Sequence, residues 1–169
     1  MPKITVPLLI FFVLVFAALQ GCYSFTGSSL PVHLKTLAIP VFEDNSAAGI
    51  AQLRGEITGS LANRIEAQSA LRLTPSAARA DALLEGAIIS FSDDPSQLSS
   101  MTERAMTNRI TVVVQARMVD RVKKTQIFSR SFVGFSDYRT GNYTARQEAL
   151  RHSVGQIIDQ IFDQIVSGW

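Results

Sequence analysis

The sequence predicts an α+β domain in which two helices pack on one face of a mostly antiparallel sheet of about four strands. Three observations support this fold class. Two segments, 50–69 and 144–165, repeat apolar residues every three or four positions, the period of an amphipathic helix. Shorter β-branched segments give the order strand, helix, three or four strands, helix. The chain has 169 residues, 47% of them apolar, which suits a single core.

The first predicted strand covers residues 34–42, "LKTLAIPVF", and is rich in apolar and β-branched side chains. It lies between Pro31 and an acidic turn at 43–45. Proline has no amide hydrogen to donate to a strand ladder. We therefore expect Pro40 to place the end of this strand at a sheet edge or a bulge.

The first predicted helix, 50–69, presents one apolar face to the core. Its apolar positions are Ile50, Leu53, Ile57, Leu61 and Ile65. Gly55 and Gly59 lie four positions apart in this helix, although each glycine costs about 1 kcal/mol relative to alanine. We expect this pair to mark close packing of the helix against the sheet.

Four strands are predicted between the helices: 71–75, 80–92, 109–119 and 126–135. Residues 92–100 are predicted to be a polar loop in which Pro95 ends any ladder. The last two strands are expected to form an antiparallel hairpin around a basic turn at 120–125. The final strand alternates mixed residues on both faces, which leaves open which face is buried.

The second predicted helix has the strongest periodicity in the chain. Its apolar positions are Leu150, Val154, Ile157, Ile158, Ile161, Phe162 and Ile165. Thr144, with Gln147 three residues later, matches the pattern of a capping box. We therefore expect Thr144 to be the N-cap.

The N-terminus has the layout of a signal peptide, with Lys3 followed by an apolar segment from Val6 to Leu19. A transmembrane anchor is the alternative, but this apolar segment is shorter than the roughly 20 residues that a spanning helix needs. The letters "LQGC" at 19–22 resemble the lipobox of bacterial lipoproteins. The resemblance implies cleavage before Cys22 and attachment of lipid to its sulfur.

The expected domain organisation is a lipoprotein signal peptide at 1–21, a lipidated tether at 22–33 and a single domain at 34–169. The tether is assigned from its glycine, proline and serine content. Residue 23 is tyrosine, so the aspartate that retains enteric lipoproteins in the inner membrane is missing. We therefore expect attachment to the periplasmic side of the outer membrane.

Composition argues against several classes of site. The 16 basic and 14 acidic residues give a net charge of +2, without the dense basic stripe typical of nucleic-acid binding. A single cysteine excludes an internal disulfide and a cysteine-cluster metal site. His33 and His152 lie far apart in the sequence and do not form a local ligand pair. We expect no metal and no cofactor.

We also expect no enzyme activity. Asp93 and Asp94 are adjacent, so in extended chain their side chains point apart and do not converge on one substrate. No G-x-S-x-G motif and no glycine-rich phosphate loop are present. A convergent site assembled only by the fold remains an alternative, and it would make the protein a lipid-anchored periplasmic hydrolase.

Basic residues are the remaining candidates for binding, because cations make charge-assisted hydrogen bonds to phosphate. They occur in three groups: Arg104 with Arg109, then Arg121 with Lys123 and Lys124, and Arg139 with Arg146. For each residue the alternative is a solvated surface position with no ligand.

Five stretches in this order resemble the LptE family of lipopolysaccharide-assembly lipoproteins, in the form typical of Bacteroidetes and Chlorobi. They are "GCYSFTGSSLPVHLKTLAIPVFEDNS", "LRGEITGSLANRI", "ADALLEGAIISF", "RITVVVQARMVD" and "YTARQEAL" with the closing "IFDQIVSGW". The resemblance implies an LptE-like α/β sandwich that sits in the lumen of the outer-membrane β-barrel LptD, assists barrel assembly and binds lipopolysaccharide. A structural lipoprotein of another envelope secretion system is the alternative.

The resemblance also bears on the basic residues. In the family, a basic residue in the loop before the central hairpin strand is linked to lipopolysaccharide contact, and Arg104 is the nearest match here. Arg109 lies beside the same connection, and Arg139 lies before the last helix. These three residues are the expected lipopolysaccharide-binding candidates.

Overall fold

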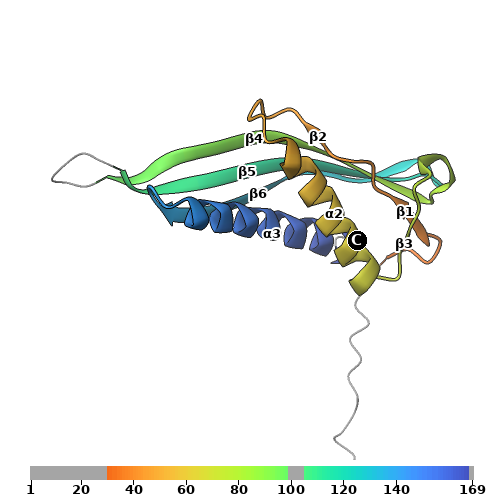
Figure 1. Cartoon of the computed structure of the whole chain (residues 1–169). Helices are drawn as coiled ribbons and strands as arrows, with labels where there is room; N and C mark the ends of the chain where they lie inside the picture. The colour runs from red at the N-terminus through yellow and green to blue at the C-terminus, as the bar shows by residue number, and fades with distance from the viewer. Residues whose placement is uncertain (1–29, 99–104, 168–169) are drawn as a thin grey trace, which may run out of the picture.

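The computed structural model describes residues 30–98 and 105–167 and has two layers, a sheet and a pair of helices that lie on the same side of it (Figure 1). The predicted signal peptide, Cys22 and Arg104 lie outside the described residues. The elements in chain order are β1 (Thr36–Ala38), β2 (Glu43–Asp44), α2 (Ala51–Gln68), β3 (Arg72–Leu73), a 3₁₀ turn (Ala77–Arg79), β4 (Ala82–Leu98), β5 (Ala105–Asp120), β6 (Thr125–Arg139) and α3 (Tyr143–Ser167).

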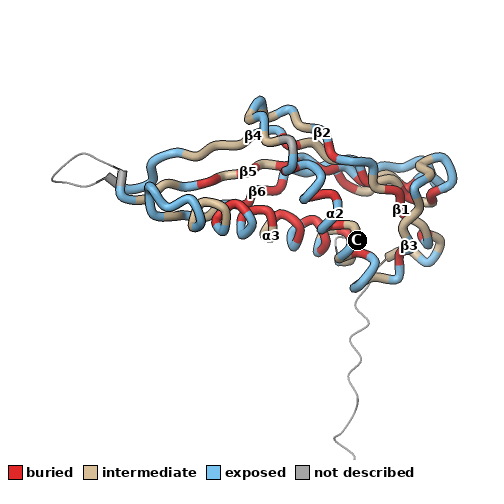
Figure 2. Tube along the Cα trace, viewed as in Figure 1, coloured by how far each residue is buried: buried red, intermediate tan, exposed pale blue. Residues whose placement is uncertain are grey.

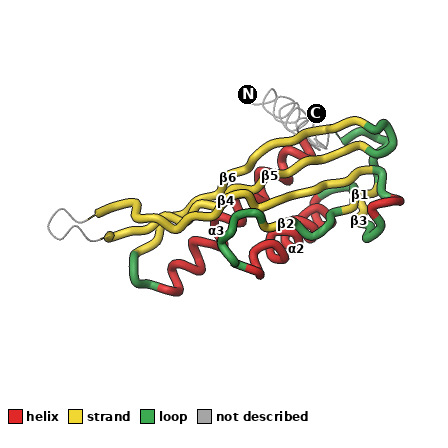
Figure 3. The backbone as a smooth tube through the Cα atoms, turned by 90° about the horizontal axis from the view of Figure 1, so that it is seen from above, coloured by secondary structure: helices red, strands yellow, loops and turns green. Residues whose placement is uncertain are grey.

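The sheet has six strands in the described part of the chain, in the order β3-β1-β4-β5-β6, with β2 also paired to β4. β4, β5 and β6 form a long antiparallel meander, while β1, β2 and β3 make parallel pairs at one edge (Figure 3). The predicted α+β class with two helices on one face is confirmed. The sheet has more strands than the expected number of about four: β1 and β3 lie within the predicted strands at 34–42 and 71–75, and β2 lies where a turn was expected.

The predicted strand at 34–42 is divided in the structure. β1 covers only Thr36–Ala38, and the expected acidic turn contains β2, which pairs with Ala87 and Ile88 of β4. Phe42 lies between the two strands and is buried against β4. A Cβ atom on Gly86 would lie 2.2 Å from Cε2 of the Phe42 ring, so a glycine at this position makes room for the phenylalanine.

The prediction that Pro95 ends the fourth strand is wrong. β4 continues to Leu98, and Pro95 lies opposite Asn108 of β5, next to a register shift at Gln97. Among the described residues no strand pairs with the other side of β4 beyond Ile88. Pro95 therefore occupies an edge position at an irregularity, where the missing amide hydrogen breaks no ladder.

The first helix matches the prediction, but its two glycines do not. Leu53, Ile57, Leu61 and Ile65 form the buried stripe of α2. Gly55 and Gly59 are exposed, and a Cβ atom on either would meet nothing within 4 Å. The close approach of helix and sheet occurs at Gly134 of β6, where an added Cβ would lie 1.9 Å from the Ser153 carbonyl oxygen of α3.

The last helix begins at Tyr143, two residues earlier than an N-cap at Thr144 implies, and Thr144 is not its N-cap. The Asn142 side-chain oxygen accepts a 3.0 Å hydrogen bond from the Ala145 amide, which is the contact of an N-cap residue. Gly141 precedes it with φ of +83°, a conformation that glycine adopts without strain. The N-cap therefore lies two residues before the position that the capping-box pattern predicted.

Two glutamines of α3 cover the outer edge of β6. Gln156 Oε1 accepts a 2.9 Å hydrogen bond from the Phe135 amide, and Gln160 Nε2 donates a 2.9 Å hydrogen bond to the Val133 carbonyl. These backbone groups point away from β5. The side chains therefore take the place of a further strand and protect the sheet edge from unwanted pairing.

A single core lies between the sheet and the helices (Figure 2). In β6 the helix-facing side chains are Phe128 and Phe132, which settles the face that the sequence left open. β5 contributes a continuous row to the same core: Ile110, Val112, Val114, Ala116 and Met118. Within the described residues, neither helix has the length and apolar content that crossing a membrane requires.

Candidate functional site

The face of β4, β5 and β6 that points away from the helices is not covered by any element of the described chain (Figures 1 and 3). Apolar side chains gather at its centre, and we call them the open-face strip: half-buried Val113 with exposed Ile89, Val133 and Phe135. Val113 lies directly opposite Val133, and Ile89 belongs to the bulge of β4 beside them. Exposed fractions of 40% for Ile89, 44% for Val133 and 49% for Phe135 are high for side chains of this kind, and such a patch is typical of an interaction surface.

Arg109 lies at one end of the strip. Its guanidinium makes a bidentate ion pair with the Asp137 carboxylate, at 2.8 Å from Nε and 2.9 Å from Nη2. The same guanidinium lies 4.9 Å from the centre of the Phe135 ring. The hydrogen bond from Arg109 lowers the pKa of Asp137, and the Asp137 carboxylate raises the pKa of Arg109. The charge of Arg109 is therefore already compensated, and an anionic ligand would have to displace Asp137.

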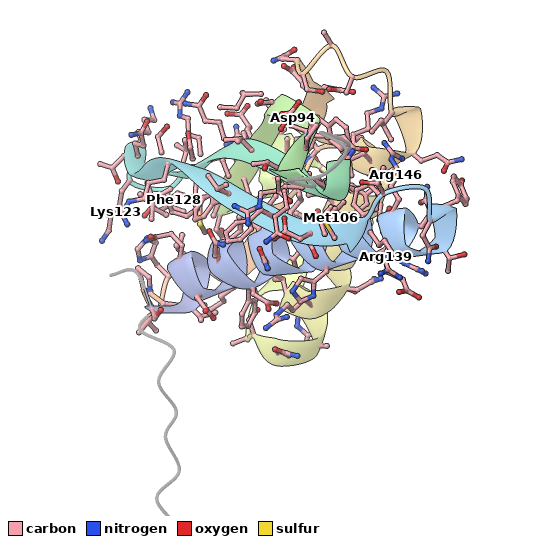
Figure 4. The ribbon with its side chains drawn as sticks, turned by 90° about the vertical axis from the view of Figure 1, so that its left-hand side faces the viewer. Asp94, Met106, Lys123, Phe128, Arg139 and Arg146 are labelled. Carbon is pink, nitrogen blue, oxygen red and sulfur yellow. The ribbon has the colours of Figure 1, made fainter. Side chains whose placement is uncertain are left out.

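Arg139 has no such partner. It is exposed at the end of β6, opposite Thr107, and within the described part of the chain its guanidinium makes no ion pair or hydrogen bond. Exposed Met106 lies nearby, since its carbonyl accepts a 3.2 Å hydrogen bond from the Thr140 amide. Figure 4 views the molecule from this end and labels Arg139 beside α3. Of Arg109 and Arg139, only Arg139 is free to bind a phosphate directly.

Arg146 is held inside a polar cluster that the sequence did not reveal. Asp93 of β4 accepts hydrogen bonds from Arg146 Nε at 2.7 Å, the Tyr138 hydroxyl at 2.7 Å and Asn108 Nδ2 at 3.2 Å. Partial burial raises the pKa of Asp93, but the hydrogen bonds from Tyr138, Arg146 and Asn108 outweigh it and the net pKa is lowered. The cluster joins three strands to the start of α3, so its role is structural. No local pattern could signal it, because its members lie far apart in sequence.

The two predicted carboxylates point to opposite faces, as expected from their adjacent positions. Asp93 faces the polar cluster, whereas exposed Asp94 lies opposite Arg109 on the open face. They do not converge on a common point. Residues 30–98 and 105–167 also contain no group of three or more histidine, cysteine or acidic side chains placed to hold a metal ion.

A shallow groove of about 420 Å³ lies on the open face beyond the other end of the strip. Its walls come from β2 and the segment before it, from the first part of β4, from the last part of β5 and from Ser129 of β6. Glu85 and Arg117 lie opposite each other across the strands, and Val41 is 62% exposed at the rim. The groove therefore combines both signs of charge with an apolar margin, which suits a protein surface better than a small anion.

The basic turn between β5 and β6 lies at the opposite end of the molecule from Arg139. The Arg121 guanidinium donates to the Ala77 carbonyl oxygen of the 3₁₀ turn. Lys123 and Lys124 are exposed. Figure 4 shows Lys123 well separated from Arg139 and Arg146, so the basic residues identified in the sequence do not form one site.

Solved structures with the same fold are distant in sequence. Protein XCC0632 from Xanthomonas campestris is 12% identical with a TM-score of 0.61, covering 82% of this chain and 91% of its own. Lipoprotein B from Nitrosomonas europaea is 17% identical with a TM-score of 0.60, covering 84% and 87%. A variant of PelC from Paraburkholderia phytofirmans, solved as a dodecamer, is 13% identical with a TM-score of 0.53, covering 84% and 95%. At these identities the similarity shows the fold alone.

Sequence comparison identifies the family. No curated protein sequence matches the chain. The family profile described as LptE, lipopolysaccharide-assembly, matches residues 34–165, which is most of the chain and nearly all of the described domain. The fold, with two helices on one face of a mixed sheet, agrees with this assignment. The chain therefore belongs to the LptE family of lipopolysaccharide-assembly proteins.

Proposed function

We propose that this protein is an outer-membrane lipoprotein that plugs an LptD-type β-barrel, assists its assembly and binds lipopolysaccharide during export to the outer leaflet. The family match over residues 34–165 carries the proposal. The lipobox-like residues before Cys22 support it, because acyl chains on that sulfur would hold the domain at the membrane without a spanning helix. The protein would act by binding and positioning, without catalysis.

The open-face strip is the surface best suited to the barrel wall. It has an apolar centre in which Phe135 is the largest side chain, and the Arg109–Asp137 ion pair borders it. Protein interfaces commonly combine an apolar centre containing aromatic side chains with a polar rim. The helices cover the other face of the sheet, so the strip is the part of the meander that a surrounding protein can reach.

Arg139 is the described residue best suited to contact lipopolysaccharide. Arg109 and Arg146 are paired with carboxylates, whereas the Arg139 guanidinium is exposed and has no partner among the described residues. Lipid A phosphates would supply the oxygen acceptors that this guanidinium lacks. Arg104 stays a candidate through the family resemblance and lies outside the described residues.

Capture of the barrel tests the first part of the proposal. The full-length protein is purified from detergent-solubilised outer membrane, and the co-purified barrel is quantified. We expect Val133→Glu to reduce capture at least about ten-fold, because a carboxylate would be buried in the contact without a partner. Asn63→Glu adds the same charge on the exposed side of α2 and is the matched control. Equal capture by both variants would remove the strip from the interface, and no barrel with the parent protein would overturn the translocon proposal.

Lipopolysaccharide binding is tested separately. Arg139→Glu should weaken binding of purified lipopolysaccharide by about five- to ten-fold, the effect of losing one charge-assisted contact, while barrel capture stays unchanged. Arg151→Glu changes an exposed arginine of α3 by the same charge and is the control. Arg104→Glu is measured in the same series. Unchanged affinity in either candidate variant would exclude that residue as a contact.

A structural role in another envelope secretion system is the second candidate. The fold is similar to that of PelC, whose solved structure is a dodecamer, so self-association is the property that would mark this candidate. The two candidates differ in assembly: a barrel plug is captured with one barrel, whereas a ring-forming lipoprotein associates with itself. The mass of the detergent-solubilised complex, measured by light scattering, distinguishes them.

A further inference from the structure

One end of the molecule carries a concentration of exposed cations that the proposed function does not use. The chain enters the domain here, beside β3, the 3₁₀ turn and the turn between β5 and β6. Hydrogen bonds join these segments: the Arg72 amide donates to the Lys35 carbonyl at 2.9 Å, and the Arg121 amide donates to the Asp81 carbonyl at 2.8 Å. We call the exposed cations of these segments the basic end: Lys35, Arg72, Arg79, Arg121, Lys123 and Lys124.

The two carboxylates in these segments are used for internal hydrogen bonds. Asp81 Oδ2 accepts from the Lys35 amide and from both the amide and the hydroxyl of Thr36, at 2.9–3.0 Å. Asp120 is buried, and it accepts from the Lys123 amide at 2.8 Å and lies 2.6 Å from His33 Nε2. Neither carboxylate pairs with a lysine or arginine side chain of the basic end. The positive charge of the basic end therefore remains at the surface. Glu66 is a nearby acidic residue, and it shares a groove with Arg72.

Two apolar side chains are exposed among these cations. Val32 is 91% exposed in the segment that enters the domain, and Val122 is 58% exposed on the hairpin turn next to Lys123. The contact between His33 and Asp120 holds the entering segment against that turn. Exposed apolar side chains close to lysines and arginines suit the interfacial region of an anionic bilayer.

Chain length places this end close to the membrane. Cys22 is eight positions before Leu30, the first described residue, and an extended chain of that length spans at most about 29 Å. Lipid attached to Cys22 would therefore hold the basic end nearer the bilayer than Arg139, which lies at the other end of the long strands. The acyl chains already hold the protein at the membrane, so a basic contact would chiefly set the orientation of the domain against the leaflet.

We propose that the basic end rests on the anionic phospholipid headgroups of the leaflet that holds the anchor, with Val32 and Val122 entering the interfacial region. The inference rests on the proposed lipidation of Cys22. Each basic residue near an anionic surface strengthens such a contact about five-fold, so the loss of two lysines reduces the ratio of contacting to free molecules roughly 30-fold. The contact would orient the domain with Arg139 pointing away from this leaflet.

The test uses the full lipidated protein reconstituted into vesicles. The chain has one cysteine, and its sulfur is blocked in the lipidated form, so Val122→Cys provides a single thiol for a fluorophore. Spin-labelled headgroups should quench this fluorophore in vesicles of phosphatidylethanolamine and phosphatidylglycerol. Quenching should be lost in Lys123→Gln/Lys124→Gln or at high salt, which screens surface charge. Tyr143→Cys, a 73% exposed position at the start of α3, is the control and should stay unquenched.

Three results would overturn the inference: equal quenching in vesicles of phosphatidylcholine alone, quenching that survives loss of both lysines, or quenching seen only when lipopolysaccharide is added. Val32→Cys repeats the measurement at a second position in case the turn variant misfolds. Mass spectrometry of the purified protein shows separately whether Cys22 is acylated. A protein that is acylated but unquenched refutes the membrane contact alone, whereas a protein without lipid refutes the proposed anchor and the contact that depends on it.

Discussion

The close contact between Gly134 and α3 predicts that a side chain at this position lowers the free energy of unfolding. A Cβ atom at this position would lie 1.9 Å from the Ser153 carbonyl oxygen, 2.8 Å from its carbon and 3.0 Å from Cγ1 of Ile157. The first two atoms belong to the helix backbone, so a rotamer change cannot relieve the clash. In Gly134→Ala the helix must therefore move away from β6, or the strand must bend.

The cost follows from what this movement disturbs. Overpacking of a core typically costs about 1–3 kcal/mol, and here the displaced element also carries Gln156 and Gln160, which bond to the edge of β6. Two weakened hydrogen bonds add about 1 kcal/mol each. We expect the free energy of unfolding of Gly134→Ala to fall by about 3–5 kcal/mol, measured by urea denaturation of the full chain.

Two other glycines provide matched controls. Gly59 and Gly155 lie in helices, and an added Cβ on either would meet nothing within 4 Å. Alanine has the higher helix propensity, so Gly59→Ala and Gly155→Ala should each raise the free energy of unfolding by about 0.5–1 kcal/mol. If Gly134→Ala is as stable as the parent while the controls behave as expected, the close approach of α3 and β6 is wrong.

The remaining stability predictions concern the polar cluster and the helix cap. Asp93→Asn removes the negative charge and replaces one of the two oxygens that accept from Tyr138 and Arg146 with a donor, so it should cost about 1.5–3 kcal/mol at neutral pH. Because the pKa of Asp93 is lowered on folding, its stabilisation is present above its unfolded value of 3.8 and is lost as pH falls through the folded pKa. The difference between parent and Asp93→Asn should therefore narrow below about pH 4 in urea titrations, and a constant difference would contradict the assignment. Asn142→Ala should cost about 1 kcal/mol, whereas Thr144→Ala should cost much less, and the reverse order would restore Thr144 as the cap.

The three proposed binding surfaces, the basic end, the open-face strip and Arg139, lie on different parts of the molecule. The basic end lies near the expected anchor, and Arg139 lies at the other end of the long strands. The open-face strip runs between them on one side of the sheet. Such an arrangement would let one domain contact a membrane, a barrel wall and an anionic ligand at the same time.

Periodicity determined most of the secondary structure. The two helices, the hairpin and its basic turn were predicted within a few residues, because each buries a regular stripe of apolar side chains that is visible in the local sequence. β2 was missed because two residues show no period. The prediction for Pro95 was wrong because a strand accepts proline where its amide faces no neighbouring strand. Among the described residues that part of β4 has no such neighbour on one side, and this is a property of the sheet, not of the local sequence.

The sequence by itself determined the class of the protein: an α+β domain behind a lipobox-like cysteine, with an ordered series of segments that resembles one family. Only the tertiary structure decided which glycine meets a helix, which arginines are already paired and which face of the sheet remains open. The physical reason is that these properties depend on distance in space. Gly134 meets α3, Arg146 meets Asp93 and Arg109 meets Asp137 across separations in sequence that no local pattern records.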